Sequence, residues 1–137
     1  MKGQYTVVQE LLLFAIGILV VVFVVSIFSN IEDTVTEYTV AQNIEKIGNR
    51  IMNGITKVLE NEEMNATIVI EVPILLSNHV YKISIGRELN ISTKVATFSQ
   101  NIFNISNKYN ISGEAMSSAG RIKIEYNQTH ITLRRFV

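Results

Sequence analysis

The chain has 137 residues, enough for one small domain and an accessory element but not for two full domains. Its 12 Lys and Arg residues balance 12 Asp and Glu residues, so no global charge attracts it to nucleic acid or to an anionic surface. The sequence has no cysteine, which excludes disulfides, thiol nucleophiles and cysteine-ligated metal sites.

The first predicted element is an apolar helix. The segment 11–28 carries no charge, and only Gly17 and Ser26 within it are not strongly apolar. A helix of this length crosses a hydrocarbon core of about 30 Å. It is apolar on every side, so lipid or a dense protein bundle must surround it. A cleaved secretory signal fits less well, because the apolar core is too long and no small-x-small cleavage site follows.

The charges that flank the apolar helix predict its orientation. Lys2 and the α-amino group precede it, whereas Glu32, Asp33 and Glu37 follow it. The positive-inside bias therefore places the N-terminus in the cytoplasm and the remainder of the chain outside.

The next segment, 31–60, has the pattern of an amphipathic helix. Apolar residues recur three or four positions apart, as Ile44, Ile47, Ile51, Ile55 and Val58. No proline precedes Pro73, so one helix can run from about Tyr5 to Glu60 and stop within 61–63. Gly48 and Gly54 weaken such a helix by about 1 kcal/mol each, and they permit close packing or a bend.

From Ala66 onward the apolar residues alternate with polar ones, which is typical of half-buried strands. We expect strands at 67–72, 81–85, 89–95, 122–126 and 131–133, one irregular strand within 100–120, and a hairpin turn at 126–129. The predicted fold class is α+β: a long N-terminal helix followed by a small antiparallel sheet or sandwich-like head of five or six strands. The predicted regions are a leader-like segment and membrane or filament-core helix (1–30), the amphipathic continuation of the helix (31–62) and a β-rich head outside the cytoplasm (63–137).

The sequence predicts no catalytic, cofactor-binding or metal-binding site, and we expect that the protein is not an enzyme. Its two histidines, His79 and His130, have no accompanying nucleophile or ligand cluster and are expected at the surface. The neighbouring carboxylates Glu62 and Glu63 are interpreted as a solvated helix end.

Asparagine provides a stronger pattern. Among 13 asparagines, five begin an Asn-x-Ser/Thr triplet, where chance gives about two, and all five follow the apolar helix. This favours an N-glycosylated surface protein, and an Asn- and Ile-rich composition is the alternative. Strand phase is expected to expose Asn90, and the hairpin turn to expose Asn127. The five candidate sites are Asn65, Asn90, Asn104, Asn110 and Asn127.

Glu10 stands at the threshold of the apolar helix. A carboxylate that enters hydrocarbon carries a large free-energy cost. Two interpretations therefore remain open: Glu10 lies in the headgroup region of an isolated helix, or it meets a partner charge in an assembled bundle.

The chain begins with Met1-Lys2-Gly3-Gln4, followed by Tyr5-Thr6-Val7-Val8-Gln9-Glu10 and the apolar segment 11–28. This arrangement resembles the class III signal peptide of archaeal type IV pilins and archaellins. The later part of the chain is also similar to archaeal pilin-like proteins, in the segments Val72-Pro73, Val80-Tyr81-Lys82-Ile83, Ser112-Gly113, 122–126 and 131–133. The resemblance implies cleavage between Gly3 and Gln4 by a prepilin peptidase, self-association through the N-terminal helices, and a β-rich head on the cell surface.

The family usually has a glutamate at the fifth mature position. Cleavage after Gly3 would put Val8 there and Glu10 seventh, and Lys2 is the one basic residue before the cut. Two interpretations follow: a major or minor subunit of an archaeal type IV pilus-like filament, or a membrane-anchored module that never polymerises. The second class includes an accessory protein of a pilus or archaellum machine and a binder of the S-layer.

Overall fold

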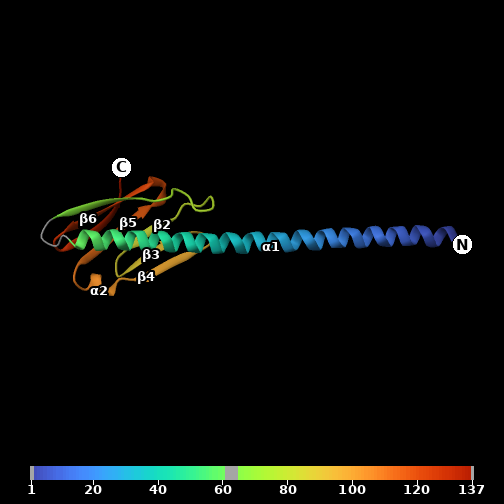
Figure 1. Cartoon of the computed structure of the whole chain (residues 1–137), viewed down its shortest axis with the longest axis horizontal. Helices are drawn as coiled ribbons and strands as arrows, with labels where there is room; N and C mark the ends of the chain where they lie inside the picture. Colours follow the sequence, from blue (N-terminus) through green and yellow to red (C-terminus); the bar gives the residue numbers. More distant parts are fainter. Residues whose placement is uncertain (1, 61–64, 137) are drawn as a thin grey trace. The chain divides into compact units, whose positions relative to one another are not determined.

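A computed structural model describes residues 2–60 and 65–136 (Figure 1). One helix, α1, runs continuously over Lys2–Leu59, which confirms that the apolar and amphipathic segments form a single helix. The chain forms two compact units, Met1–Thr36 and Glu37–Val137. We call the second the head unit. It contains the C-terminal part of α1 together with the whole of the sheet.

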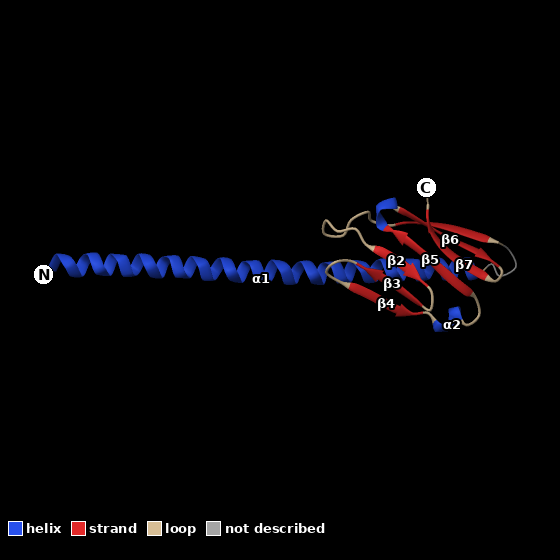
Figure 2. Cartoon of the chain, turned by 180° about the vertical axis from the view of Figure 1, so that it is seen from behind, coloured by secondary structure: helices blue, strands red, loops and turns tan. Residues whose placement is uncertain are grey.

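The head unit is α+β, as predicted, with α1 covering one face of a single seven-stranded sheet in the described residues (Figure 2). The strand order across the sheet is β1-β6-β7-β5-β2-β3-β4. A short helix α2 connects β4 to β5, and a 3₁₀ turn at Ser117–Ala119 connects β5 to β6. The strands are β1 (Ala66–Glu71), β2 (Lys82–Ile85), β3 (Glu88–Ser92), β4 (Thr97–Asn101), β5 (Asn110–Met116), β6 (Arg121–Asn127) and β7 (His130–Arg135), and α2 is Phe103–Ser106.

The sheet differs from the prediction in two respects: in the described part of the chain it has seven strands rather than five or six, and one of its strand pairs is parallel. β6 and β7 form the expected hairpin, with Gln128 at φ 44° in its turn. β7 then pairs with β5 in parallel, so the sheet is mixed. The parallel pair brings the backbone of Leu133 so close to Gly113 that a Cβ at Gly113 would collide with it. Gly113 also has φ +148°, a conformation that L side chains rarely adopt.

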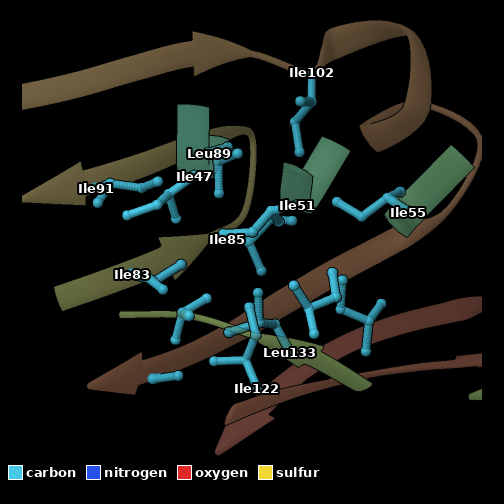
Figure 3. Close-up of a cluster of buried hydrophobic side chains, with 14 of the residues drawn as sticks. Ile47, Ile51, Ile55, Ile83, Ile85, Leu89, Ile91, Ile102, Ile122 and Leu133 are labelled. Atoms are coloured by element: carbon cyan, nitrogen blue, oxygen red, sulfur yellow. The ribbon is translucent and has the colours of Figure 1, made fainter. Parts of the chain in front are cut away.

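The core lies between α1 and the covered face of the sheet (Figure 3). Ile47, Ile51 and Ile55 point from the helix toward strand residues such as Ile83 and Leu133. Residues at these helix positions lie on one face because the spacing of three or four matches 3.6 residues per turn. The predicted amphipathic face is therefore the face that packs on the sheet.

Two helix glycines allow the sheet to approach closely. A Cβ at Gly48 would lie 2.9 Å from Cζ of Phe98, and one at Gly54 would lie 2.5 Å from Cδ1 of Ile70. Side chains of the sheet thus fill the space that a larger residue would need. Of the two roles expected for these glycines, close packing is the one that the structure shows.

A partly buried group of hydrogen bonds secures the long connection between β1 and β2. The Ser117 hydroxyl accepts a hydrogen bond from the Tyr81 backbone N–H (3.0 Å) and donates one to the Ile74 carbonyl (2.7 Å). The Tyr81 hydroxyl donates to the Pro73 carbonyl at 2.6 Å. These bonds satisfy polar groups that burial would otherwise leave unpaired. They hold the loop 73–80 against the sheet.

Candidate membrane-spanning and assembly helix

The side chains of the apolar segment of α1 are exposed. Among the described residues, α1 is the one helix long and apolar enough to cross a membrane, and none of its most apolar window is buried. Side chains as large as Leu19 and Phe23 are each 68% exposed. At about 25 cal/mol per Å² of apolar surface, such exposure in water is strongly unfavourable. An apolar environment such as lipid would remove this cost.

A shallow depression marks one side of the apolar segment. It is centred on Gly17, where an added Cβ would meet nothing within 4 Å. Its walls repeat at helical spacing, so they belong to one side of α1. Small residues let a neighbouring helix approach closely in lipid or in a bundle. The lining residues are Leu13, Phe14, Gly17, Ile18, Val21 and Val22.

The predicted processing and assembly residues lie in the first turns of α1. Gly3, Gln4 and Glu10 are all exposed helical residues, and an added Cβ at Gly3 would meet nothing within 4 Å. A peptidase that cuts after Gly3 would find the bond within α1, so the helix would have to unwind locally to enter an active site. Glu10 is six residues from Gln4, about 9 Å along the same helix. Within one chain, Glu10 is therefore too far from a new amino group at Gln4 to form an ion pair with it.

Four of the five candidate glycosylation sites gather at one end of the sheet. Asn110 and Asn127 both pair with His130 across the sheet, and Asn65 directly precedes β1, which pairs with β6. Asn104 lies in α2, which leads into the same end (Figure 2). All four are exposed.

Asn90 is placed differently. As expected, it lies on the sheet face opposite α1. It is half-buried rather than exposed, because it lies between Ser84 and Ser99 on the neighbouring strands. Its Oδ1 is buried, with no hydrogen-bond partner in the described part of the chain. The alternation of the strand gave the correct face. It could not show how tightly the neighbouring strands enclose the side chain.

The two histidines each lie beside one polar group of a nearby residue. His79 Nδ1 lies 2.7 Å from the Ser77 carbonyl oxygen, and His130 Nδ1 lies 2.7 Å from Thr129 Oγ1. Within residues 2–60 and 65–136, no group of three His, Cys, Asp or Glu side chains could hold a metal ion. Glu62 and Glu63 lie outside the described residues.

Sequence reasoning missed a hollow of about 530 Å³ that polar and apolar side chains line together. The ion pair Lys82–Glu114 (2.8 Å) borders it, and so does Arg135. These residues belong to β2, β5 and β7, which lie far apart in sequence. No local pattern signals such a site, since only the strand order brings the three side chains together.

Comparisons with known proteins returned no similar protein: no protein-family model matches the chain, and neither a curated protein nor a solved structure resembles it significantly.

Proposed function

We propose that the chain is a structural subunit, major or minor, of an archaeal type IV pilus-like surface filament. The observation that carries this proposal is the contrast within α1. Its apolar segment is exposed on all sides, whereas the part in the head unit is buried against a sheet. A helix of the first kind needs lipid or similar helices around it. The resemblance of residues 1–28 to archaeal pilin and archaellin leaders favours similar helices.

The proposed subunit enters the membrane with its N-terminus in the cytoplasm and its head outside. Lys2 before the apolar segment and Glu32 and Asp33 after it support this orientation. Protease added to intact cells, stripped of any S-layer, is expected to remove the head. Protection of the head until lysis would overturn the orientation.

Assembly in this proposal follows removal of the leader at Gly3 by a prepilin peptidase. The apolar helix then exchanges lipid for neighbouring helices, where packing rather than the hydrophobic effect favours association. The depression at Gly17 offers such a neighbour a place to pack. The heads would form the outer surface and present glycans from the end of the sheet that carries Asn110 and Asn127.

Glu10 would act as an assembly residue. In an apolar bundle an unpaired carboxylate costs several kcal/mol, so a stabilising partner must be close. The new amino group at Gln4 of an axially displaced neighbour is such a partner, because the 9 Å within one chain is too far. Glu10→Gln is therefore expected to reduce incorporation into filaments and to leave membrane insertion unchanged. Sheared-filament and membrane fractions of the mutant test this, and normal incorporation would contradict it.

The second candidate is an anchored module that does not polymerise, such as an accessory protein of the machine or a binder of the S-layer. The position of Glu10, seventh rather than fifth after the proposed cut, favours it. N-terminal sequencing of the native protein separates the two. A mature N-terminus at Gln4, in sheared filaments, supports the subunit. An intact Met1, found only in membranes, supports the anchor.

A further inference from the structure

Two pairs of like charges stand on α1. Asp33 and Glu37 are four residues apart, and so are Lys46 and Arg50. Residues at i and i+4 are neighbours on a helix, so each pair sets two like charges side by side and weakens an isolated helix. All four side chains are exposed, and within the described residues none of them forms an ion pair. Among residues 2–60 and 65–136, therefore, no ion pair neutralises the acidic pair or the basic pair.

The two pairs have matching spacing. Asp33 and Lys46 are thirteen positions apart, and so are Glu37 and Arg50. For Glu37 and Arg50, both in the head unit, this is about 20 Å along the helix and about 220° around it. The two side chains therefore leave nearly opposite sides of α1 and cannot meet within one chain.

The basic pair borders a receptive surface. A hollow of about 260 Å³ beside α1 is lined by Asn43, Lys46, Arg50 and, from the loop after β1, Pro73 and Leu76. Nη1 of Arg50 donates to the Glu71 carbonyl at 3.2 Å, which holds the guanidinium at this hollow. A planar guanidinium fixed in this way retains further N–H donors for a carboxylate.

We propose that a second copy of the chain, parallel and displaced by about 20 Å along the helix axis, places its Asp33 and Glu37 against Lys46 and Arg50 of the first. The contact rests on the proposed filament and specifies the axial displacement of one pair of neighbouring copies. The pairing of Glu10 with Gln4 needs a displacement of about 9 Å and therefore involves a different neighbour. Because the two surfaces lie on different sides of α1, each copy contacts one neighbour through its acidic pair and another neighbour through its basic pair. Such a heterologous contact continues from copy to copy and builds a filament rather than a closed dimer.

The absence of cysteine from the chain allows a direct test in sheared filaments. In Glu37→Cys/Arg50→Cys, the two Cα atoms of one chain are about 20 Å apart, far beyond the roughly 4–7 Å that a disulfide spans. Oxidation should therefore link neighbouring copies into a ladder of multimers on a denaturing gel. The matched control Glu37→Cys/Lys57→Cys, also at exposed α1 positions, should give no ladder.

Charge reversal tests the same contact by function. Asp33→Lys/Glu37→Arg should lower the sheared-filament fraction about tenfold, which corresponds to about 1.4 kcal/mol. Adding Lys46→Glu/Arg50→Glu should restore it, because the opposite charges face one another again. The control is Glu45→Lys/Lys57→Glu. In the proposed register, Glu45 would face Val58 and Lys57 would face Ile44 of a neighbouring copy, and both of these residues are buried, so no charge pair is lost.

The possible results separate this contact from the proposed function. If the wild type and the cysteine variant both form filaments but the cysteine variant gives no more cross-linked multimers than its control, the proposed register is wrong and the filament proposal still stands. The same holds if the reversal variant assembles normally. A wild type that yields no filaments would overturn the proposed function, and the contact with it.

Discussion

The two parts of α1 share one backbone conformation and have opposite surroundings. In the apolar segment, Ile18 is 49% exposed, whereas in the head unit Ile51 is fully buried. The apolar segment has isoleucine, leucine and valine at every angle, while the head part has them on one side only. The difference teaches that apolar content alone does not bury a helix. A one-sided pattern lets a single chain complete its own core, and an all-round pattern requires lipid or a protein bundle around the helix.

The same substitution in the two parts should have very different effects on the head. Ile51→Ala should lower the free energy of unfolding by roughly 3–4 kcal/mol, because it leaves a cavity in the core. For a unit of this size the midpoint of thermal unfolding should fall by roughly 15 °C. Ile18→Ala should leave that midpoint unchanged. Circular dichroism of the detergent-solubilised chain measures both, and equal shifts would break the comparison.

Tyr81 extends the comparison to pH. Burial raises the pKa of Tyr81 to about 12, and the charge of Arg50 opposes that rise. The unfolded tyrosine titrates near pH 10, so between pH 10 and 12 the unfolded state has released a proton that the folded state retains. The contribution of Tyr81 to the free energy of unfolding should therefore be fully present below pH 10. The free energy of unfolding should then fall by roughly 2–3 kcal/mol toward pH 12.

Tyr81→Phe is the control for this pH dependence. It removes the titrating group and the hydrogen bond to Pro73, at a cost of about 1 kcal/mol at neutral pH. Denaturant unfolding at several pH values should show a shallower alkaline decline in the mutant. Identical slopes for the two proteins would assign the decline to other groups.

Glycine gives a smaller test of the same contrast. Gly48→Ala should destabilise the head by about 1 kcal/mol, since displacement of the Phe98 ring outweighs the improved helix propensity. Gly17→Ala should not destabilise the head, because its Cβ meets nothing in the chain. In the proposed filament it fills the depression and should lower the sheared-filament fraction.

A double-mutant cycle identifies the contact at Gly48. In a Phe98→Leu background the smaller side chain leaves room, so Gly48→Ala should lose most of its cost. A cost that persists unchanged would show that Phe98 is not the group that resists the added methyl.

The smallest effect on stability is expected at the asparagines. In native material, Asn127→Gln should remove the mass of one glycan, because the side chain is exposed in the hairpin. Asn90→Gln should remove none, because neighbouring strands half-bury the side chain. Intact-protein mass spectrometry measures both. Native protein at its unmodified mass would favour a biased composition as the origin of the triplets.

The sequence alone predicted the continuous helix, its buried face at Ile44, Ile47 and Ile51, and the hairpin between β6 and β7. These features depend on residues close in sequence, where the periods of 3.6 and 2 directly reflect side-chain direction. The same reasoning found the apolar segment and the five Asn-x-Ser/Thr triplets. It expected one irregular strand within 100–120, where the structure has α2 and β5 and completes β4, because polar residues interrupt the alternation there.

Only the tertiary structure decided which strands are neighbours. It inserted β7 between β6 and β5 in parallel with β5, enclosed Asn90 between two strands, and gathered four of the Asn-x-Ser/Thr triplets at one end of the sheet. It also placed Phe98 over Gly48 and Lys82 beside Glu114. Each of these relations joins residues distant in sequence. Local periodicity fixes the face on which a side chain lies, but strand order and register, set by packing of the whole core, fix what it meets.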